Sequence, residues 1–248
     1  HLSRKMSKLG KNPERNALNL VKTKHNNSYV EHDSGYWRMY YFVKDAVGFE
    51  RCKSEQMAYE CGKAFGEFQN LLTDIPDSEN LHETIPDFHN VIKRNQSFED
   101  ILSKDPIGRA KNVGAEIEAI RSWAEEMAKI EKARIDGELP LRITHNDTKL
   151  NNVLLDRRTE DAVCVIDLDT VMPGVSLYDF GDGIRTISNS SLEDEEELDK
   201  VWFNLSYFRR FSHGYLEEAR GFLSDKEREF LPLAGRLFPY LMLLRFLT

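Results

Sequence analysis

The stretch that most constrains the fold is residues 144–155, where a dense group of polar side chains is followed at once by an apolar strand pattern. A second strand pattern follows at Ala162–Ile166, after a turn. If Val153–Leu155 and Ala162–Ile166 form a hairpin, Asp167 returns to the side of Asn152. The sequence therefore predicts a polar loop and a short hairpin that meet at one site.

A spaced set of polar residues, His-x-Asp-x-x-x-x-Asn and then an Asp after the hairpin, comprises His145, Asp147, Asn152 and Asp167. Phosphoryl transfer needs a carboxylate on a rigid loop to orient the attacking hydroxyl and accept its proton. It also needs oxygen ligands for Mg²⁺, of which the protein supplies only one or two. Lys149 can reach a transferred phosphoryl group as a point charge. Singly, these residues could be turn formers, but their joint spacing favours phosphoryl transfer.

The stretch resembles the catalytic loop of the protein-kinase-like fold, in its aminoglycoside phosphotransferase and choline kinase branch. The resemblance implies that Asp147 is the catalytic base and that Asn152 and Asp167 hold magnesium. It also implies ATP as the phosphate donor and a small molecule as the acceptor.

The same resemblance implies supporting roles for two further residues. His145 would brace the loop. Tyr178–Asp182 resembles the segment that follows the metal ligand in this branch, and Asp179 would anchor the loop through backbone N–H groups.

Two runs, 145–149 and 165–174, resemble more narrowly the N-acetylhexosamine 1-kinase group. This likeness implies transfer of the ATP γ-phosphate to the anomeric hydroxyl of an amino sugar. An aminoglycoside, choline or a homoserine-type alcohol is the alternative acceptor. The alternative class is a non-catalytic, pseudokinase-like binding module, which would lack the Asp/Asn/Asp set that this chain has.

The resemblance also interprets the start of the chain, where residues 1–43 look like a helix and the last two strands of a nucleotide lobe. Tyr41, Phe42 and Val43 would then belong to a hinge that offers backbone groups to adenine, although an ordinary edge strand has the same pattern. No Gly-rich phosphate loop or strand lysine precedes residue 17, so we expect a truncated small lobe. The expected domains are 1–45, a partial nucleotide lobe with the hinge, and 46–248, a helical catalytic lobe.

Strand patterns dominate the first part of the chain and helix patterns the last, which favours an α+β fold with a small β lobe and a large helical lobe. Apolar residues recur at helical spacing in Ser54–Leu72 and Gly114–Ile135. After Tyr178 the pattern predicts further helices, at about 178–188, 194–219, 225–233 and 235–248. Before these segments, strands are expected at Ala17–Lys22, Ser28–Val30 and Tyr36–Val43.

The net charge of −8 argues against binding to a nucleic-acid backbone. No run of 18 apolar residues and no signal peptide are seen, so no membrane association is expected. The three cysteines lack metal-ligand spacing and indicate free thiols in a reducing, cytoplasmic setting.

Two residues are candidates for substrate contact. Arg245 lies among apolar residues near the end of the chain, where it would pair with a carboxylate, reach solvent or contact the substrate. Asp169 could be a second metal or substrate ligand, or a turn former before Pro173-Gly174.

Overall fold

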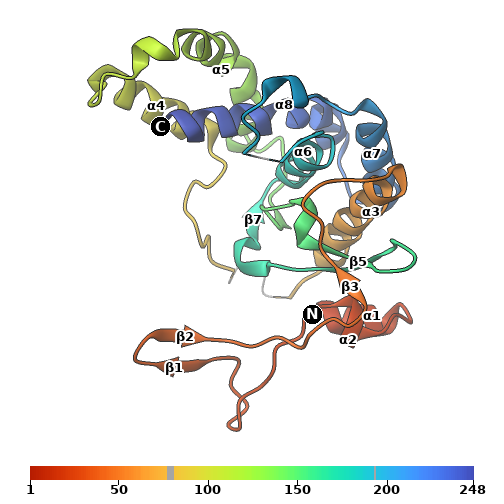
Figure 1. Ribbon diagram of the computed structural model, residues 1–248. Helices are drawn as coiled ribbons and strands as arrows, with labels where there is room; N and C mark the ends of the chain where they lie inside the picture. Colours follow the sequence, from red (N-terminus) through yellow and green to blue (C-terminus); the bar gives the residue numbers. More distant parts are fainter. Residues whose placement is uncertain (77–80, 193) are drawn as a thin grey trace.

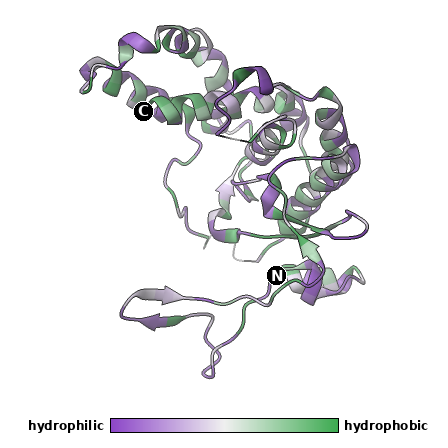
Figure 2. Ribbon diagram, in the orientation of Figure 1, coloured by the Kyte–Doolittle hydropathy of each residue, from purple (hydrophilic) through white to green (hydrophobic). Residues whose placement is uncertain are grey.

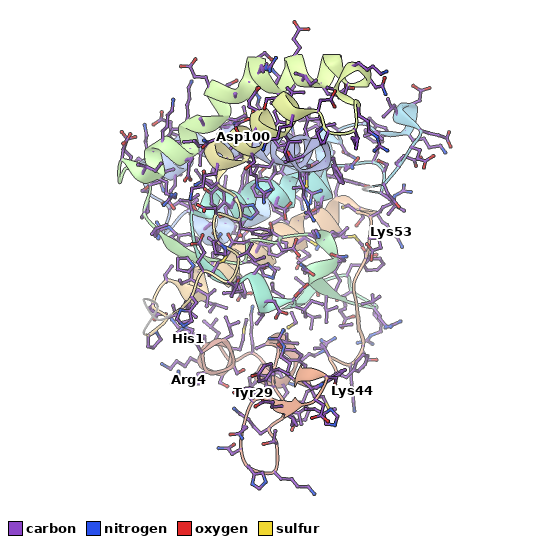
Figure 3. The ribbon with its side chains drawn as sticks, turned by 90° about the vertical axis from the view of Figure 1, so that its left-hand side faces the viewer. His1, Arg4, Tyr29, Lys44, Lys53 and Asp100 are labelled. Atoms are coloured by element: carbon purple, nitrogen blue, oxygen red, sulfur yellow. The ribbon has the colours of Figure 1, made fainter. Side chains whose placement is uncertain are left out.

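The computed structural model describes residues 1–76, 81–192 and 194–248. A small N-terminal part, residues 1–43, lies at one end of a larger helical part (Figure 1). Tyr29 and Asp100 lie near opposite ends of the molecule (Figure 3). The helices are α1 (Leu2–Lys8), α2 (Pro13–Asn16), α3 (Glu55–Leu72), α4 (Val91–Lys104), α5 (Gly114–Ile135), α6 (Ser176–Ile187), α7 (Leu205–Ala219) and α8 (Asp225–Leu247). The strands are β1 (Val30–His32), β2 (Gly35–Trp37), β3 (Ala46–Val47), β4 (Arg142–Thr144), β5 (Val153–Asp156), β6 (Ala162–Val165) and β7 (Met172–Gly174).

Helix α3 forms much of the core and confirms the helix predicted at Ser54–Leu72. It begins where the Ser54 hydroxyl accepts a hydrogen bond from the Met57 amide at 3.0 Å, an N-cap that satisfies one donor of the first turn. Its apolar stripe, which includes Met57 and Phe65, is fully buried. Gly62 lies so close to the carbonyl of Phe211 on α7 that a side chain there would overlap it.

The predicted hairpin is confirmed, and it joins a third strand. Strand β5 pairs antiparallel with β6, with Val153 opposite Val165, and β3 pairs with the other edge of β5. Strand β4 pairs with β7, with Thr144 opposite Met172. The sequence pattern did not indicate β3 or β7, because strands of two or three residues show no period of two.

Helix α8 corrects the prediction of two helices at 225–233 and 235–248. It runs without a break although Pro232 and Pro239 lie inside it. It packs closely on α6, where Gly181 lies against the carbonyl of Ala234, and packing of this kind can outweigh the cost of a proline within a helix. Figure 2 shows many hydrophobic residues along α8. By length and composition α8 is also the one helix of the described residues that could cross a membrane, a property shared by helices buried in protein cores.

Two other helices differ from the prediction. Helix α4 forms at Val91–Lys104, where the sequence analysis predicts no helix; of its residues only Val91 and Phe98 are buried. Helix α7 begins at Leu205, after the Asn204 side chain caps it, and not at 194. The acidic run at 193–197 is typical of the first turn of a helix. Glu193 lies outside the described residues, and the residues after it form a turn, an irregular stretch and one short 3-10 helix, Leu198–Lys200.

The N-terminal part is less regular than the predicted strands. Strands β1 and β2 form a projecting hairpin (Figure 1). The segment predicted as a strand at Ala17–Lys22 makes one isolated bridge, between Leu20 and Tyr40, together with a hydrogen bond from the Val21 amide to the Met39 carbonyl at 2.8 Å. In the larger part, Cys61 and Cys164 are buried and, like Cys52, free, as predicted.

Candidate functional site

Residues 145–152, here called the catalytic-loop candidate, directly follow strand β4. Asp179 of α6 holds them in place. The Asp179 carboxylate accepts hydrogen bonds from the amides of His145 at 2.9 Å and Asn146 at 2.7 Å. It also accepts one from the Gln69 side chain of α3 at 2.6 Å. The Thr148 hydroxyl donates to the Asp179 carbonyl at 2.7 Å. The loop is therefore fixed by backbone contacts to one buried carboxylate.

His145 joins the same loop to the hairpin. Its Nε2 donates to the Ile166 carbonyl at 2.8 Å, which requires the tautomer with a proton on Nε2. The ring is fully buried and lies edge-on to Phe65 and Phe68 of α3. The Thr170 hydroxyl donates to the His145 carbonyl at 2.6 Å. The position of the end of β6 is thereby tied to that of the loop.

Asp147, Lys149 and Asn152 come together on the loop. The Lys149 ammonium lies 3.2 Å from Asp147 Oδ1. The Asn152 amide Nδ2 donates to the Asp147 carbonyl at 2.7 Å and to Asp147 Oδ2 at 3.2 Å. Asn152 is buried, whereas Asp147 and Lys149 are partly exposed. Because Nδ2 of Asn152 is used, its Oδ1 is the atom that can ligate a cation.

The hairpin brings Asp167 to the same place. The Ile166 amide donates to the Asn152 carbonyl at 2.9 Å, so the next residue, Asp167, lies beside the loop. Its backbone is left-handed, with φ 58°, a conformation that Asp and Asn tolerate better than most residues. Its side chain is exposed.

Two oxygen donors, the Asn152 amide and the Asp167 carboxylate, suit Mg²⁺, which prefers oxygen and keeps several ligands from water and phosphate. Among residues 1–76, 81–192 and 194–248, no group of three or more His, Cys, Asp or Glu could hold a metal by itself. The donor set fits a magnesium ion that is bound together with phosphates.

Asp169, two residues further on, has a different partner. It forms an ion pair with Arg38 of the N-terminal part, and this hydrogen bond raises the pKa of Arg38. The Thr84 hydroxyl donates to its carbonyl at 3.2 Å. Its side chain is largely exposed, so the pair joins the two parts of the molecule at the surface.

A cleft of about 470 Å³, here the N-terminal cleft, separates the N-terminal part from the hairpin. Tyr41, Phe42 and Val43 line one side, and Ile166 and Asp167 are among the residues that line the other. The Tyr41 amide donates to the Asn19 carbonyl at 2.9 Å. The amides of Phe42 and Val43 make no hydrogen bond to the described part of the chain. Tyr41 and Phe42 are exposed and Val43 is buried.

Arg245 lies in the last turn of α8 and is exposed. Within the described residues no carboxylate lies at ion-pair distance from it. Its charge is close enough to Arg94 of α4 to lower the pKa of that guanidinium, after the larger effect of burial. The structure therefore places Arg245 beside α4, not in contact with Asp147 or Asn152.

Three residues of the site were missed in the sequence. Asn146 has a left-handed backbone, φ 65°, and its Nδ2 donates to the carbonyls of Thr144 at 3.2 Å and Thr170 at 3.0 Å. The buried ring of His89 donates from Nε2 to the Asn146 carbonyl at 3.0 Å. Gln69 contacts Asp179 as described. Only Asn146 had a local signal, its place inside the motif; Gln69 and His89 are distant in sequence and become partners through the fold.

Comparison with known proteins identifies the family and the fold. The model of the phosphotransferase enzyme family, APH, matches residues 31–220. An aminoglycoside phosphotransferase from Alicyclobacillus acidocaldarius subsp. acidocaldarius DSM 446 superposes with a TM-score of 0.60 at 13% identity, over 98% of this chain and 69% of that one. The AMP-bound complex of spectinomycin phosphotransferase superposes with a TM-score of 0.55 at 16% identity, over 94% of this chain and 69% of that one. Choline kinase from Cryptosporidium parvum Iowa II superposes with a TM-score of 0.50 at 15% identity, over 95% of this chain and 66% of that one.

At these identities the likeness concerns the fold, and the chain spans about two thirds of the length of these proteins. The α+β, protein-kinase-like fold class expected from the sequence is confirmed, with a large helical part and small sheets. The match to residues 31–220 includes the catalytic-loop candidate, the hairpin and Asp179. This chain belongs to the phosphotransferase enzyme family.

Proposed function

We propose that this protein transfers the γ-phosphate of ATP to a hydroxyl group of a small molecule. One observation carries the proposal. Asp147 and Asn152 are hydrogen-bonded to each other on a loop that Asp179 holds rigid, and the hairpin places Asp167 beside them. A carboxylate for the hydroxyl and oxygen donors for a cation thus occupy one site.

In the reaction, the Asp147 carboxylate orients the acceptor hydroxyl and accepts its proton. The hydroxyl oxygen forms a bond to the γ-phosphorus while the bond from that phosphorus to the bridging oxygen of ADP breaks. Lys149, whose ammonium lies 3.2 Å from Asp147, stabilises the charge of the moving phosphoryl group. His145 and Asp179 keep the loop in place.

Asn152 Oδ1 and the Asp167 carboxylate would hold Mg²⁺, which neutralises the charge of the phosphates when bound. The N-terminal cleft would take the nucleotide, because Asp167 lies at its wall and Val43, Ala46 and Leu154 supply an apolar lining. The amides of Phe42 and Val43 are the candidates for adenine contacts.

The leading acceptor is the anomeric hydroxyl of an N-acetylhexosamine, on the strength of the two runs at 145–149 and 165–174. Other family acceptors are an aminoglycoside, choline or a homoserine-type alcohol. Arg245 and Asp169 are further candidates for substrate contact; Asp169 is paired with Arg38, and Arg245 lies beside α4. Free cysteines support a cytoplasmic location.

The test is ADP release by the full-length protein with Mg·ATP and a panel of N-acetylglucosamine, N-acetylgalactosamine, glucose, choline, homoserine and kanamycin. We expect turnover with the N-acetylhexosamines and an acid-labile sugar phosphate as the product. Turnover with another acceptor alone would retain the kinase and refute the amino sugar.

The matched variant is Asp147→Asn, which preserves shape but cannot accept the proton. Loss of a general base lowers kcat by a factor of about 10² to 10⁴, and Mg·ATP affinity should stay near that of the wild type. A kcat within threefold of wild type would refute the role of Asp147.

A further inference from the structure

Two histidines, His89 and His145, hold the two polar atoms of one peptide group, the one that joins Asn146 to Asp147. The Nε2 of His89 donates to the Asn146 carbonyl at 3.0 Å. The Nδ1 of His145 accepts from the Asp147 amide at 3.3 Å. Because the C=O and N–H of a trans peptide group point in opposite directions, the two imidazoles contact it from opposite sides. The peptide group that precedes the candidate base is thus fixed at both ends.

The tautomers of the two rings agree with these roles. His145 donates from Nε2 to the Ile166 carbonyl at 2.8 Å, which leaves its Nδ1 as the acceptor. Burial lowers the pKa of His89 to about 4, so at pH 7 its ring is neutral and carries one N–H. The carbonyl partner requires that proton on Nε2. Neither hydrogen bond therefore requires a charged ring.

The backbone at this point gives the two hydrogen bonds something to oppose. Asn146 has a left-handed conformation, φ 65°, which is less favourable than the right-handed one even for Asn. Rotation of the 146–147 peptide group would exchange the places of its C=O and N–H and would change φ of Asp147. Since the allowed rotamers of a side chain depend on the backbone angles of its residue, such a rotation would alter where the Asp147 carboxylate can point.

His89 is itself held by three helices. It lies just before α4, and the Arg94 guanidinium of that helix donates to the Phe88 carbonyl at 3.0 Å. The His89 ring contacts those of Tyr178 of α6 and Phe238 of α8, with 5.0 Å between ring centroids in each case. The imidazole is buried. Its Nε2 is therefore presented to the Asn146 carbonyl from a well-packed position.

We propose that His89 is a positioning residue for Asp147: by holding the Asn146 carbonyl, it keeps the 146–147 peptide group, and with it the Asp147 carboxylate, in the orientation that the acceptor hydroxyl needs. His89 acts through the backbone of Asn146 and is not itself a catalytic residue. The inference rests on the proposed function, to which it adds a link from helix α4 to the base.

The experiment compares His89→Leu, which fills the space but has no donor, with His89→Gln, whose amide restores an N–H. Tyr240→Phe is the matched control, because it removes another buried hydrogen bond to α4, one that does not involve the loop. The first readout is hydrogen exchange of the Asp147 amide in the full-length protein by NMR, with the Phe65 amide of α3 as the reference for global opening. We expect exchange of Asp147 relative to Phe65 to be on the order of tenfold faster in His89→Leu and within about threefold of wild type in the other two variants.

The second readout is steady-state kinetics with Mg·ATP and the acceptor that the panel identifies. A small displacement of a base lowers the rate of the chemical step more than it weakens binding. We therefore expect kcat to fall on the order of tenfold in His89→Leu and to recover to within about threefold of wild type in His89→Gln. The KM for ATP should stay within about twofold in all variants, since other residues line the N-terminal cleft.

The outcomes separate this inference from the proposed function. Equal exchange of the Asp147 amide in His89→Leu and wild type overturns the hold on the peptide group. Faster exchange with an unchanged kcat overturns the positioning role, as does a loss of kcat that His89→Gln does not restore or that Tyr240→Phe reproduces. Absence of ADP release by the wild type refutes the proposed function and the catalytic part of this inference, whereas the exchange rates still decide whether His89 holds the peptide group.

Discussion

Asp179 shows how a single residue can set the geometry of the whole site. A buried carboxylate is costly unless hydrogen bonds satisfy it, and here three N–H donors, from His145, Asn146 and Gln69, do so. The Gln69 Oε1 in turn accepts from the Tyr215 hydroxyl at 2.6 Å. Burial raises the pKa of Asp179, and these donors oppose the rise. Its position in the sequence motif could be predicted, but the donors from α3 and α7 could not.

The buried imidazole of His89 leads to a prediction about how the free energy of unfolding depends on pH. Burial lowers the pKa of its imidazole to about 4, against about 6.5 in an unfolded chain. Its hydrogen bond to Asn146 and the charge of Asp147 oppose this shift, and the charges of Arg94 and Arg185 add to it. The unfolded state therefore binds a proton that the folded state does not, once the pH falls below about 6.5. The contribution of His89 to the free energy of unfolding is complete above about pH 6.5. It declines as the pH falls toward 4, by up to about 3 kcal/mol.

The measurement is the free energy of unfolding by urea at pH 7, 6, 5 and 4.5. In His89→Gln, which keeps an N–H for the Asn146 carbonyl, the loss of stability between pH 7 and 4.5 should be smaller than in the wild type. His25→Gln, at an exposed histidine, should follow the wild type. If His89→Gln has the same pH slope as the wild type, His89 does not carry a lowered pKa.

At the scale of elements, the contact between α3 and α7 depends on glycine. A Cβ at Gly62 would overlap the Phe211 carbonyl, and one at Gly214 would lie 2.9 Å from the Lys63 amide. Gly62→Ala should therefore lower the free energy of unfolding by about 3 kcal/mol, as overpacking does in a close-packed core. Gly114→Ala is the control, because nothing lies within 4 Å of that position at the start of α5. In urea unfolding it should match the wild type or exceed it by up to about 1 kcal/mol; equal losses at both positions would contradict the packing argument.

The elements also show what could be predicted from the sequence and why. Strong apolar periodicity over many residues indicated α3 and α5 correctly, because one face of each meets the core. Helix α4 escaped prediction because its buried residues are few, and the prolines of α8 suggested a break that packing on α6 prevents. Strand β3 pairs with β5, and strand β7 pairs with β4. Their partners lie far away in the sequence, so a local pattern could not predict these strands.

For the molecule as a whole, the motif predicted that His145, Asp147, Asn152 and Asp167 come together, because 22 positions separate His145 from Asp167 and the β5–β6 hairpin closes the distance. The contacts of Gln69 and His89 with the site could not be predicted, since both residues lie far from it in the sequence. The N-terminal cleft likewise could not be predicted, because it depends on how residues 38–43 lie over the β5–β6 hairpin. There the Arg38–Asp169 ion pair joins the two parts of the molecule.

This arrangement predicts that nucleotide and metal together stabilise the molecule. A ligand that binds only the folded state, at a hundred times its Kd, adds about 2.7 kcal/mol, which for a chain of this size raises Tm by about 5–10 °C. We expect such a shift with Mg·ADP in differential scanning fluorimetry, and most of it should vanish with EDTA. Asp167→Asn should lose the Mg-dependent part yet keep the unliganded Tm, because Asn tolerates the left-handed backbone and the side chain is exposed. Asp169→Asn is the matched control and should retain the Mg-dependent shift, because that carboxylate pairs with Arg38. If instead Asp169→Asn loses the Mg-dependent shift in Tm and Asp167→Asn retains it, Asp169 holds the metal and the assignment of Asp167 is wrong.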